Sequence, residues 1–216
     1  MARRADDYGK RGVQTRKRIL DAAFRLIGHE RGLSVRIEEV CVAASISRAA
    51  FYHYFTGMEE LFAALSVEIS HEFNMAVFST VRHMTSAVER TDAGTRYYLD
   101  KAASDPAWGW AMVHISANGP LFGAEAAMAA LGTIGQGIAA GEMTIPGAEL
   151  GRDLQQGTVL ATMLSQLKRG GLESHGAAVS LHILLGLGVS AEVARDVVSR
   201  PLPAPSFDPT VLCDTG

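Results

Sequence analysis

The stretch that decides the fold runs over residues 34–61 and reads SVRIEEVCVAASISRAAFYHYFTGMEEL. Apolar residues recur at helical spacing on both sides of a short break: Val40 and Ala44 precede it, and Phe51 and Phe55 follow it. The pattern predicts two short helices joined by a tight turn, the second aromatic and almost free of acidic residues. That layout is typical of a helix-turn-helix whose second helix enters the major groove of DNA.

The predicted helix starts follow from two serines, with Ser34 as the N-cap of the first helix and Ser47 as the N-cap of the second. Side chains that project away from the packed face are then free to meet DNA. We expect Arg48 to bind a guanine or a phosphate, and Ala49 to contact a thymine methyl group. Tyrosine and histidine side chains donate to phosphates or base edges. The predicted DNA-contacting residues are Arg16, Ser34, Arg36, Ser47, Arg48, Ala49, Tyr52, His53 and Tyr54.

Charge is unevenly distributed along the chain. The 216 residues contain 20 Lys and Arg against 23 Asp and Glu, a net charge of −3. Residues 1–60 alone hold 11 basic and 8 acidic residues, whereas residues 61–216 hold 9 and 15. A basic arm before a helix-turn-helix is suited to phosphates or to a minor groove, and the alternative is a solvated, disordered terminus. The arm is formed by Arg3, Arg4, Lys10, Arg11, Arg16, Lys17 and Arg18.

These residues resemble the TetR family of bacterial transcription regulators. The matching positions are 40–47, 51–55 and 59–61, together with 18–23 and Gly32 upstream. The resemblance implies an N-terminal three-helix domain and a helical domain that binds a small effector and dimerises. A two-fold dimer in turn predicts a palindromic operator. Repression is the default function in this family.

The chain departs from the family pattern at three positions of the helix-turn-helix. Cys41 replaces an alanine, which is a small apolar exchange. Ser45 replaces a glycine in the turn, and Met58 replaces a lysine that commonly meets a phosphate. If residue 45 requires a positive φ, serine costs about 1 kcal/mol relative to glycine. One backbone contact is expected to be missing at Met58.

The remainder of the chain predicts an all-α fold, because strand patterns are scarce and 48% of the residues are hydrophobic. Three segments are expected: the basic arm and DNA-binding domain (1–57), the effector-binding and dimerisation domain (58–200), and a proline-rich irregular tail (201–216). Glycine, proline and serine punctuate the helices. The predicted helices span 15–30, 36–43, 47–54, 58–82, 84–103, 106–117, 121–140, 147–169, 175–187 and 190–199.

Compartment and cofactors follow from what the sequence contains. The charged N-terminus has no apolar signal region, and Cys41 and Cys213 form no metal-ligand or disulfide pattern. We therefore expect a cytoplasmic protein without a metal or another cofactor. The uncharged stretches 106–124 and 174–191 contain polar residues or glycines and prolines, and are expected to be buried helices rather than membrane spans.

The helices over 147–169 and 175–187 are expected to form the dimer, because the second is apolar on nearly every side. The alternative is a helix that is central to its own bundle.

A small-molecule effector is expected to bind among the middle helices, where aromatic residues and methionines gather. The same residues are also ordinary core residues. The low charge of the region favours a neutral, apolar compound. The expected effector residues are Phe78, Tyr97, Trp108, Trp110, Met112, His114, Phe122 and Met163.

Two other function classes remain open. One is a protein–protein adaptor with a degenerate helix-turn-helix, which Ser45 and Met58 favour and Arg48 opposes. The other is an all-α enzyme, which the sequence does not favour. His71 and His83 lack the His-Glu-x-x-His spacing of a zinc site, and no glycine-rich phosphate loop is present.

Overall fold

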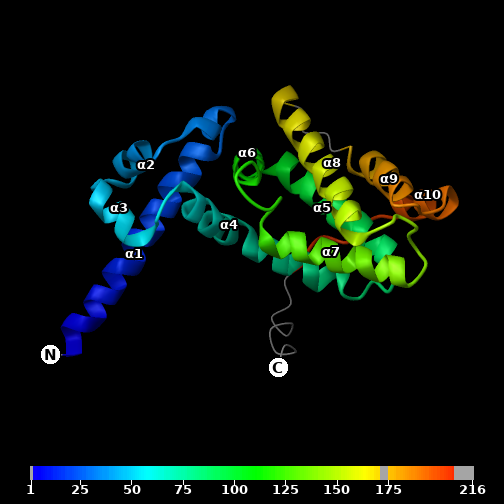
Figure 1. Ribbon diagram of the computed structural model, residues 1–216, viewed down its shortest axis with the longest axis horizontal. Helices are drawn as coiled ribbons and strands as arrows, with labels where there is room; N and C mark the ends of the chain where they lie inside the picture. Colours follow the sequence, from blue (N-terminus) through cyan, green and yellow to red (C-terminus); the bar gives the residue numbers. More distant parts are fainter. Residues whose placement is uncertain (1, 171–174, 207–216) are drawn as a thin grey trace.

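The computed structural model describes residues 2–170 and 175–206, and every regular element in these ranges is helical (Figure 1). The predicted all-α fold is therefore confirmed. In chain order the helices are α1 (Ala2–Ile27), the 3-10 helix η1 (Glu30–Ser34), α2 (Ile37–Ala44), α3 (Arg48–Tyr54), α4 (Met58–Val81), α5 (Ala87–Ser104), α6 (Pro106–Ser116), α7 (Ala124–Ala139), α8 (Ala148–Arg169), α9 (Gly176–Gly186) and α10 (Ala191–Ser199).

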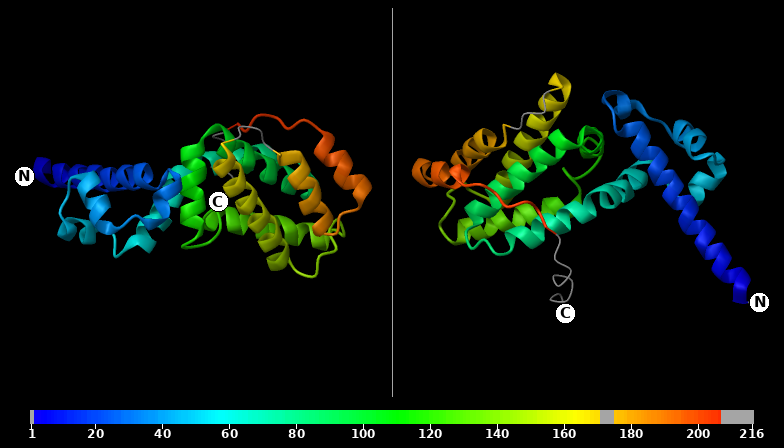
Figure 2. Two further views of the ribbon diagram at one scale, coloured as in Figure 1. Left: turned by 90° about the horizontal axis from the view of Figure 1, so that it is seen from above. Right: turned by 180° about the vertical axis from the view of Figure 1, so that it is seen from behind.

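The first helix begins well before its predicted start at residue 15. Residues 2–14 contain no proline, so the helix can extend backwards through them despite Gly9 and Gly12. The extension projects beyond the other helices of its domain (Figures 1 and 2), and Val13 is 72% exposed. The other predicted helices end within about three residues of their predicted bounds. Residues 201–206 are irregular as predicted, and the rest of the predicted tail lies outside the described residues.

The N-terminal helices pack around their own hydrophobic core. α1 contributes Ile19, Leu20 and Ala23, whose spacing places them on one face of the helix, and all are buried. This core does not end at residue 57. Leu61 and Leu65 of α4 belong to it, as do Ala111 and Ile115 of α6. The two domains are therefore joined through packed side chains of α4 and α6.

A second core surrounds α5, which contacts α4 and every helix from α6 to α10. Large side chains fill the space between these helices, and those with 2% exposure or less include Leu99, Trp108, Met112, Ile134, Met143, Met163, Ile183 and Leu184. Both uncharged stretches contribute buried residues to this core: Trp108, Met112 and Phe122 from 106–124, and Ile183, Leu184 and Leu187 from 174–191. Among the residues whose structure is described, no helix has the length and apolar character required to span a bilayer.

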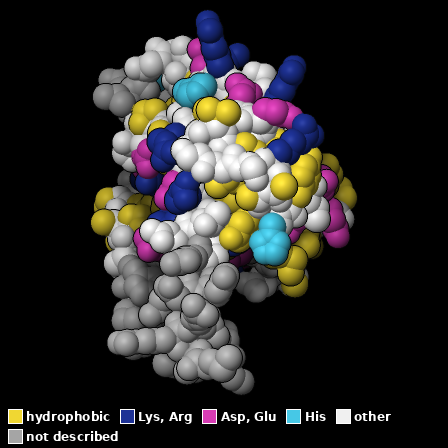
Figure 3. Space-filling view, turned by 90° about the vertical axis from the view of Figure 1, so that its left-hand side faces the viewer, with side chains coloured by type: hydrophobic (Ala, Val, Ile, Leu, Met, Phe, Trp, Pro, Cys, Tyr) yellow, Lys and Arg dark blue, Asp and Glu magenta, His cyan; other side chains and the backbone are white. Residues whose placement is uncertain are grey.

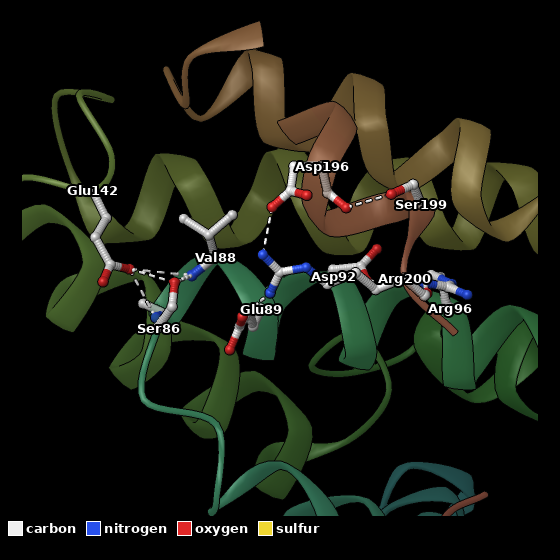
Figure 4. Close-up of polar contacts among 10 residues, drawn as sticks. Ser86, Val88, Glu89, Asp92, Arg96, Glu142, Asp196, Ser199 and Arg200 are labelled. Carbon is white, nitrogen blue, oxygen red and sulfur yellow. Dashed lines mark hydrogen bonds and ion pairs between the residues drawn. The ribbon is translucent and has the colours of Figure 1, made fainter. Parts of the chain in front are cut away.

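Polar contacts near the start of α5 connect it to the segment after α7 and to the end of α10 (Figure 4). Near the start of α5, the Glu142 carboxylate accepts hydrogen bonds from the backbone N–H groups of Ala87 (2.8 Å) and Val88 (3.2 Å). An acceptor at this position satisfies N–H groups that a helix start leaves unpaired. After α10, Arg200 pairs with Glu89 of α5 at 2.6 Å and with Asp196 of α10. The terminal helix α10 is thus held on the outer side of α5.

Candidate nucleic-acid interface and ligand cavity

The turn between α2 and α3 adopts the backbone conformation that favours glycine. Ser45 has φ +53° and ψ +51°, so the conditional expectation of a positive φ at this position is confirmed. The Ser45 N–H donates to the carbonyl of Val42 (3.1 Å), and the Ile46 N–H donates to that of Cys41 (3.0 Å). Burial raises the pKa of the Cys41 thiol, in keeping with a small apolar residue in this position.

Arg18 stabilises the same turn. Its guanidinium donates to the carbonyl oxygen of Ala44 and, at 3.3 Å, to that of Ser45. The carbonyl groups at a helix C-terminus attract a cation, so the side chain caps α2. Arg18 was expected in the DNA-contacting arm, and the structure instead engages it within the protein.

The start of α2 differs from the prediction. Ser34 ends the 3-10 helix η1, and its hydroxyl donates to the carbonyl of Arg31 (3.2 Å), so the prediction of Ser34 as an N-cap is wrong. The N-cap is Arg36, whose N–H donates to the Glu39 carboxylate three residues later at 2.8 Å. Glu39 thereby supplies one half of a capping box without the usual serine or threonine.

The predicted recognition helix α3 begins as expected. The Ser47 hydroxyl accepts a hydrogen bond from the Ala50 N–H at 3.1 Å, which confirms Ser47 as its N-cap. Phe51 and Phe55 are 0% and 2% exposed and anchor the inner face. The outer face carries exposed Arg48, Ala49, Tyr52 and His53, whereas Tyr54 is half-buried.

Arg48 is held by a neighbouring acid and a neighbouring ring. Its guanidinium lies 2.7 Å from the Glu38 carboxylate of α2 and donates to the Tyr52 hydroxyl at 3.3 Å. It also lies 5.7 Å from the centre of the Tyr52 ring. These contacts restrict the rotamers of an exposed arginine and orient it. Sequence reasoning missed Glu38, because its position opposite Arg48 depends on the angle between α2 and α3.

Contacts around the end of α3 fix its junction with α4. The Glu60 carboxylate accepts hydrogen bonds from the Thr56 N–H and hydroxyl, both at 2.7 Å. These bonds lower the pKa of Glu60. The Arg16 guanidinium lies 5.4 Å from the Phe55 ring centre, and Met58 packs half-buried against the N-terminal core.

Basic and acidic side chains are mixed on the end of the molecule that carries α2 and α3 (Figure 3). Lys17 lies 3.6 Å from Asp21 and 3.7 Å from Glu68, so it too has protein partners. Arg16 and Arg36 are exposed. For residues 2–11 the structure describes the helix but not the side chains, which include those of Arg3, Arg4, Lys10 and Arg11.

A cavity of about 90 Å³ lies between α4, α5, α7 and α8. Of the expected effector residues, Phe78 and Phe122 line it. The remaining lining residues are Val77, Val81, Arg90, Thr91, Gly94, Thr95, Tyr98, Ala126, Ala129, Ala130, Thr133, Gln155, Gln156 and Val159. The wall is predominantly apolar, with polar groups contributed mainly by α5 and α8.

Other expected effector residues belong to the core. The Trp108 indole N–H donates to the Ile69 carbonyl at 3.1 Å, and Met112 and Met163 are 0% exposed. The Tyr97 hydroxyl donates to the Pro203 carbonyl at 2.7 Å, away from the cavity. These side chains pack against neighbouring helices, because α5, α6 and α8 each contact several other helices.

His114 and Trp110 lie at the junction with the N-terminal helices instead. Their rings stack at a centroid distance of 5.7 Å. The His114 Nε2 lies 2.9 Å from the His29 carbonyl oxygen, and since a carbonyl only accepts, the ring nitrogen is the donor. Burial lowers the pKa of His114. Asn118 donates to the His114 carbonyl at 3.0 Å.

The cavity wall contains a strained backbone position. Phe122 has φ +59°, which is unusual for a bulky residue, and it precedes Gly123 at φ +86°. The Phe122 N–H donates to the Ser116 hydroxyl at 3.1 Å, and its ring meets that of Tyr98 edge-on at 5.1 Å. Burial of the ring, which is 3% exposed, holds the conformation in place.

Two family models match the chain. One, described as "Bacterial regulatory proteins, tetR family", matches residues 19–65. The other, described as "Tetracyclin repressor-like, C-terminal domain", matches residues 87–200.

Curated relatives match only part of the chain. The HTH-type transcriptional regulator BetI of Brucella canis is 28% identical over 78 residues, which cover 36% of this chain and 39% of BetI. BetI of Brucella abortus is 33% identical over 66 residues, 29% of this chain and 33% of that protein. The match thus spans less than half the length of these relatives.

Solved structures share the fold over most of the chain. RolR in complex with resorcinol has a TM-score of 0.73 at 24% identity, covering 92% of this chain and all of RolR. RolR without ligand has a TM-score of 0.71 at 25% identity, covering 88% of this chain and all of RolR. FadR from Bacillus subtilis in complex with stearoyl-CoA has a TM-score of 0.61 at 19% identity, and the match covers 81% of this chain and 98% of FadR.

Proposed function

The chain belongs to the TetR family of bacterial transcription regulators, and from this premise we propose that it is a dimeric, sequence-specific DNA-binding regulator. It acts as a repressor that a small effector releases from a palindromic operator. Its site of action is the cytoplasm, where bacterial DNA lies. The observation that carries this proposal is the two-sided character of α3, buried at Phe51 and Phe55 and exposed at Arg48, Ala49 and Tyr52.

Each exposed residue of α3 has a role in this proposal. Arg48, oriented by Glu38, reads a guanine, Ala49 contacts a thymine methyl group, and Tyr52 donates to a phosphate or a base edge. The other proposed DNA contacts are Arg16, Ser34, Arg36, Ser47, His53 and Tyr54.

Dimerisation is proposed through α8 and α9. Along α8, Leu150, Leu154, Gly157, Ala161 and Leu164 recur every three or four residues and are exposed or half-buried in the single chain. That spacing forms one stripe on a helix. Two copies of the α8–α9 pair bury these stripes against each other and set two α3 helices at a fixed separation.

Effector response is proposed to travel along α4. Val77, Phe78 and Val81, near its C-terminal end, line the cavity, whereas Leu61 and Leu65, near its start, lie in the DNA-binding core. A ligand that favours one placement of α4 and a DNA that favours another bind antagonistically.

Fluorescence anisotropy with labelled promoter DNA from beside the protein's own gene tests this function. We expect affinity to fall steeply with salt and Arg48→Ala to cost about 1–3 kcal/mol, relaxing preference at one base pair of each half-site. Arg195→Ala, an exposed arginine on α10, is the matched control and should leave affinity unchanged. If Arg48→Ala weakens binding to promoter DNA and to random DNA equally, Arg48 contacts the DNA backbone rather than a base.

The adaptor function has one observation in its favour. Arg48 is already paired with Glu38, so its positive charge is partly neutralised before any DNA arrives. The same titration separates the two functions, because an adaptor shows no salt-dependent affinity for any genomic fragment.

A further inference from the structure

We infer that the cavity between α4, α5, α7 and α8 takes a compact, uncharged molecule with an apolar ring and a hydroxyl group, and that Thr91 and Gln155 bind the hydroxyl. This inference rests on the proposed effector function and specifies its ligand.

Thr91 and Gln155 both line the cavity and are 2% and 8% exposed. Among the described residues, neither Thr91 Oγ1 nor Gln155 Oε1 has a hydrogen-bond partner. A buried polar atom without a partner is costly, and such atoms are rare in native proteins. Two such atoms, in cavity-lining residues of adjoining helices, indicate a polar group that arrives with a ligand.

The orientation of the Gln155 amide decides what that group must do. Its Nε2 donates to the Thr91 carbonyl and to Thr95 Oγ1, both at 3.3 Å. A carbonyl oxygen only accepts, so turning the amide over would set Oε1 against another acceptor. Oε1 is therefore the atom left free, and it requires a donor.

A ligand hydroxyl satisfies both free oxygens at once. It donates its proton to Gln155 Oε1 and accepts a hydrogen bond from the Thr91 hydroxyl, since Thr91 Oγ1 either donates or accepts. A carboxylate, which only accepts, leaves Gln155 Oε1 unpaired. A purely apolar ligand leaves both oxygens unpaired.

Arg90, a charged side chain in the cavity wall, is already held by acceptors of the protein and so does not require an anionic ligand. Among the described residues that line the cavity, Arg90 is the only charged side chain. Its guanidinium already donates to the Met84 carbonyl (2.7 Å), the Thr85 carbonyl (3.1 Å) and Gln136 Oε1 (2.8 Å). Because these neutral acceptors share the guanidinium, an anionic ligand would have to compete with them for it.

Size and lining determine the body of the ligand. The cavity of about 90 Å³ is small beside the roughly 300–1,000 Å³ of drug-sized sites. Phe78, Tyr98 and Phe122 contribute rings to its wall, and α7 lines it with the small side chains of Ala126, Ala129 and Ala130. Aromatic walls pack well against a ring, edge-on or offset.

Isothermal titration calorimetry on the full chain tests the inference with phenol, toluene and benzoate, which share a ring and differ in one group. We expect phenol to bind about tenfold or more tightly than either of the others, as for a hydrogen bond that spares buried groups from remaining unpaired. Thr91→Val and Gln155→Met should reduce the preference for phenol over toluene to about twofold or less. The matched control, Thr133→Val, removes a hydroxyl from the same wall, and its preference should stay unchanged.

Thermal unfolding of the ligand-free variants provides an independent readout. Valine has nearly the shape of threonine, so Thr91→Val removes an unpaired oxygen without creating a large cavity. We expect its Tm to equal or exceed that of the unaltered chain. A Tm several degrees lower would mean that the Thr91 hydroxyl stabilises the fold, and would overturn its role as a ligand group.

Three results overturn the inference: equal affinity for phenol and toluene, tighter binding of benzoate, or no binding of any of the three compounds. DNA release is measured separately by anisotropy. Selective phenol binding that leaves DNA bound supports the ligand class and contradicts the effector function. Release by toluene and phenol at equal concentrations supports the effector function and overturns the ligand class.

Discussion

At the scale of single residues, Ser45 is the clearest case of a local cost. Its φ of +53° places a β-carbon where a carbonyl oxygen crowds it, and Arg18 holds the turn by binding the carbonyls of residues 44 and 45. We expect Ser45→Gly to raise the free energy of unfolding by about 1 kcal/mol in urea titrations.

Ser190→Gly is the matched control for Ser45→Gly. Ser190 is an N-cap with φ −61°, and its hydroxyl accepts a hydrogen bond from the Val193 N–H. Glycine there should lower stability by a few tenths of a kcal/mol. If glycine raised the free energy of unfolding at position 190 but not at position 45, the strain assigned to the turn would be contradicted.

Met58 is the second informative residue, since it packs half-buried at the first position of α4. Met58→Lys should steepen the dependence of log affinity on log salt by about one unit, because one more phosphate is neutralised. Met128→Lys, on an exposed methionine of α7, is the control and should leave the salt slope unchanged. A slope equally unaffected by Met58→Lys would mean that position 58 does not face the DNA backbone.

At the scale of helices, the contact between α6 and the end of α1 is a pH-dependent junction. Burial lowers the pKa of His114, so the unfolded chain binds a proton more readily than the folded chain. Stability should therefore be constant above the ordinary pKa of about 6.5 and fall as pH drops below it, by up to about 1.4 kcal/mol per pH unit.

Urea titrations at pH 7.5 and pH 5.5 measure this loss. His114→Phe should lower stability at pH 7.5, because the His29 carbonyl loses its donor, and should reduce the difference between the two pH values. His83→Gln, an exposed histidine at the end of α4, should keep the full difference. An undiminished difference in His114→Phe would assign the pH dependence to other groups.

Helical elements could be predicted from the sequence more fully than the cavity. Periodic apolar residues and capping residues such as Ser47 are local signals. They predicted the position of α3 and its buried residues Phe51 and Phe55. The cavity depends on which faces of α4, α5, α7 and α8 meet. Tyr97 and Tyr98 are adjacent in sequence, yet Tyr98 lines the cavity and Tyr97 binds the C-terminal segment.

At the scale of the whole molecule, the proposed function needs two connections at once: one between the two domains of a chain, and one between the two chains of a dimer. α4 and α6 join the DNA-binding core to the effector domain through Leu65, Ala111 and Ile115, so a shift in one domain is felt in the other. In the proposed dimer, α8 and α9 at the same time hold two chains together. Only a firm dimer converts a small tilt of α4 into a changed distance between two α3 helices.

The proposed dimer surface is testable with residues that are already exposed in the single chain. Leu150→Glu, at 56% exposure, should leave folding intact but convert a particle of twice 23.0 kDa into one of 23.0 kDa in light scattering after gel filtration. Val67→Glu, at 54% exposure on α4, is the matched control and should remain a dimer. Each Leu150→Glu monomer would then bind one half-site on its own, so its affinity for the operator should fall about 100-fold or more. A dimer that persists in Leu150→Glu and in Ala161→Glu would place the interface elsewhere, and the spacing of the two α3 helices would have to be derived from a different pair of helices.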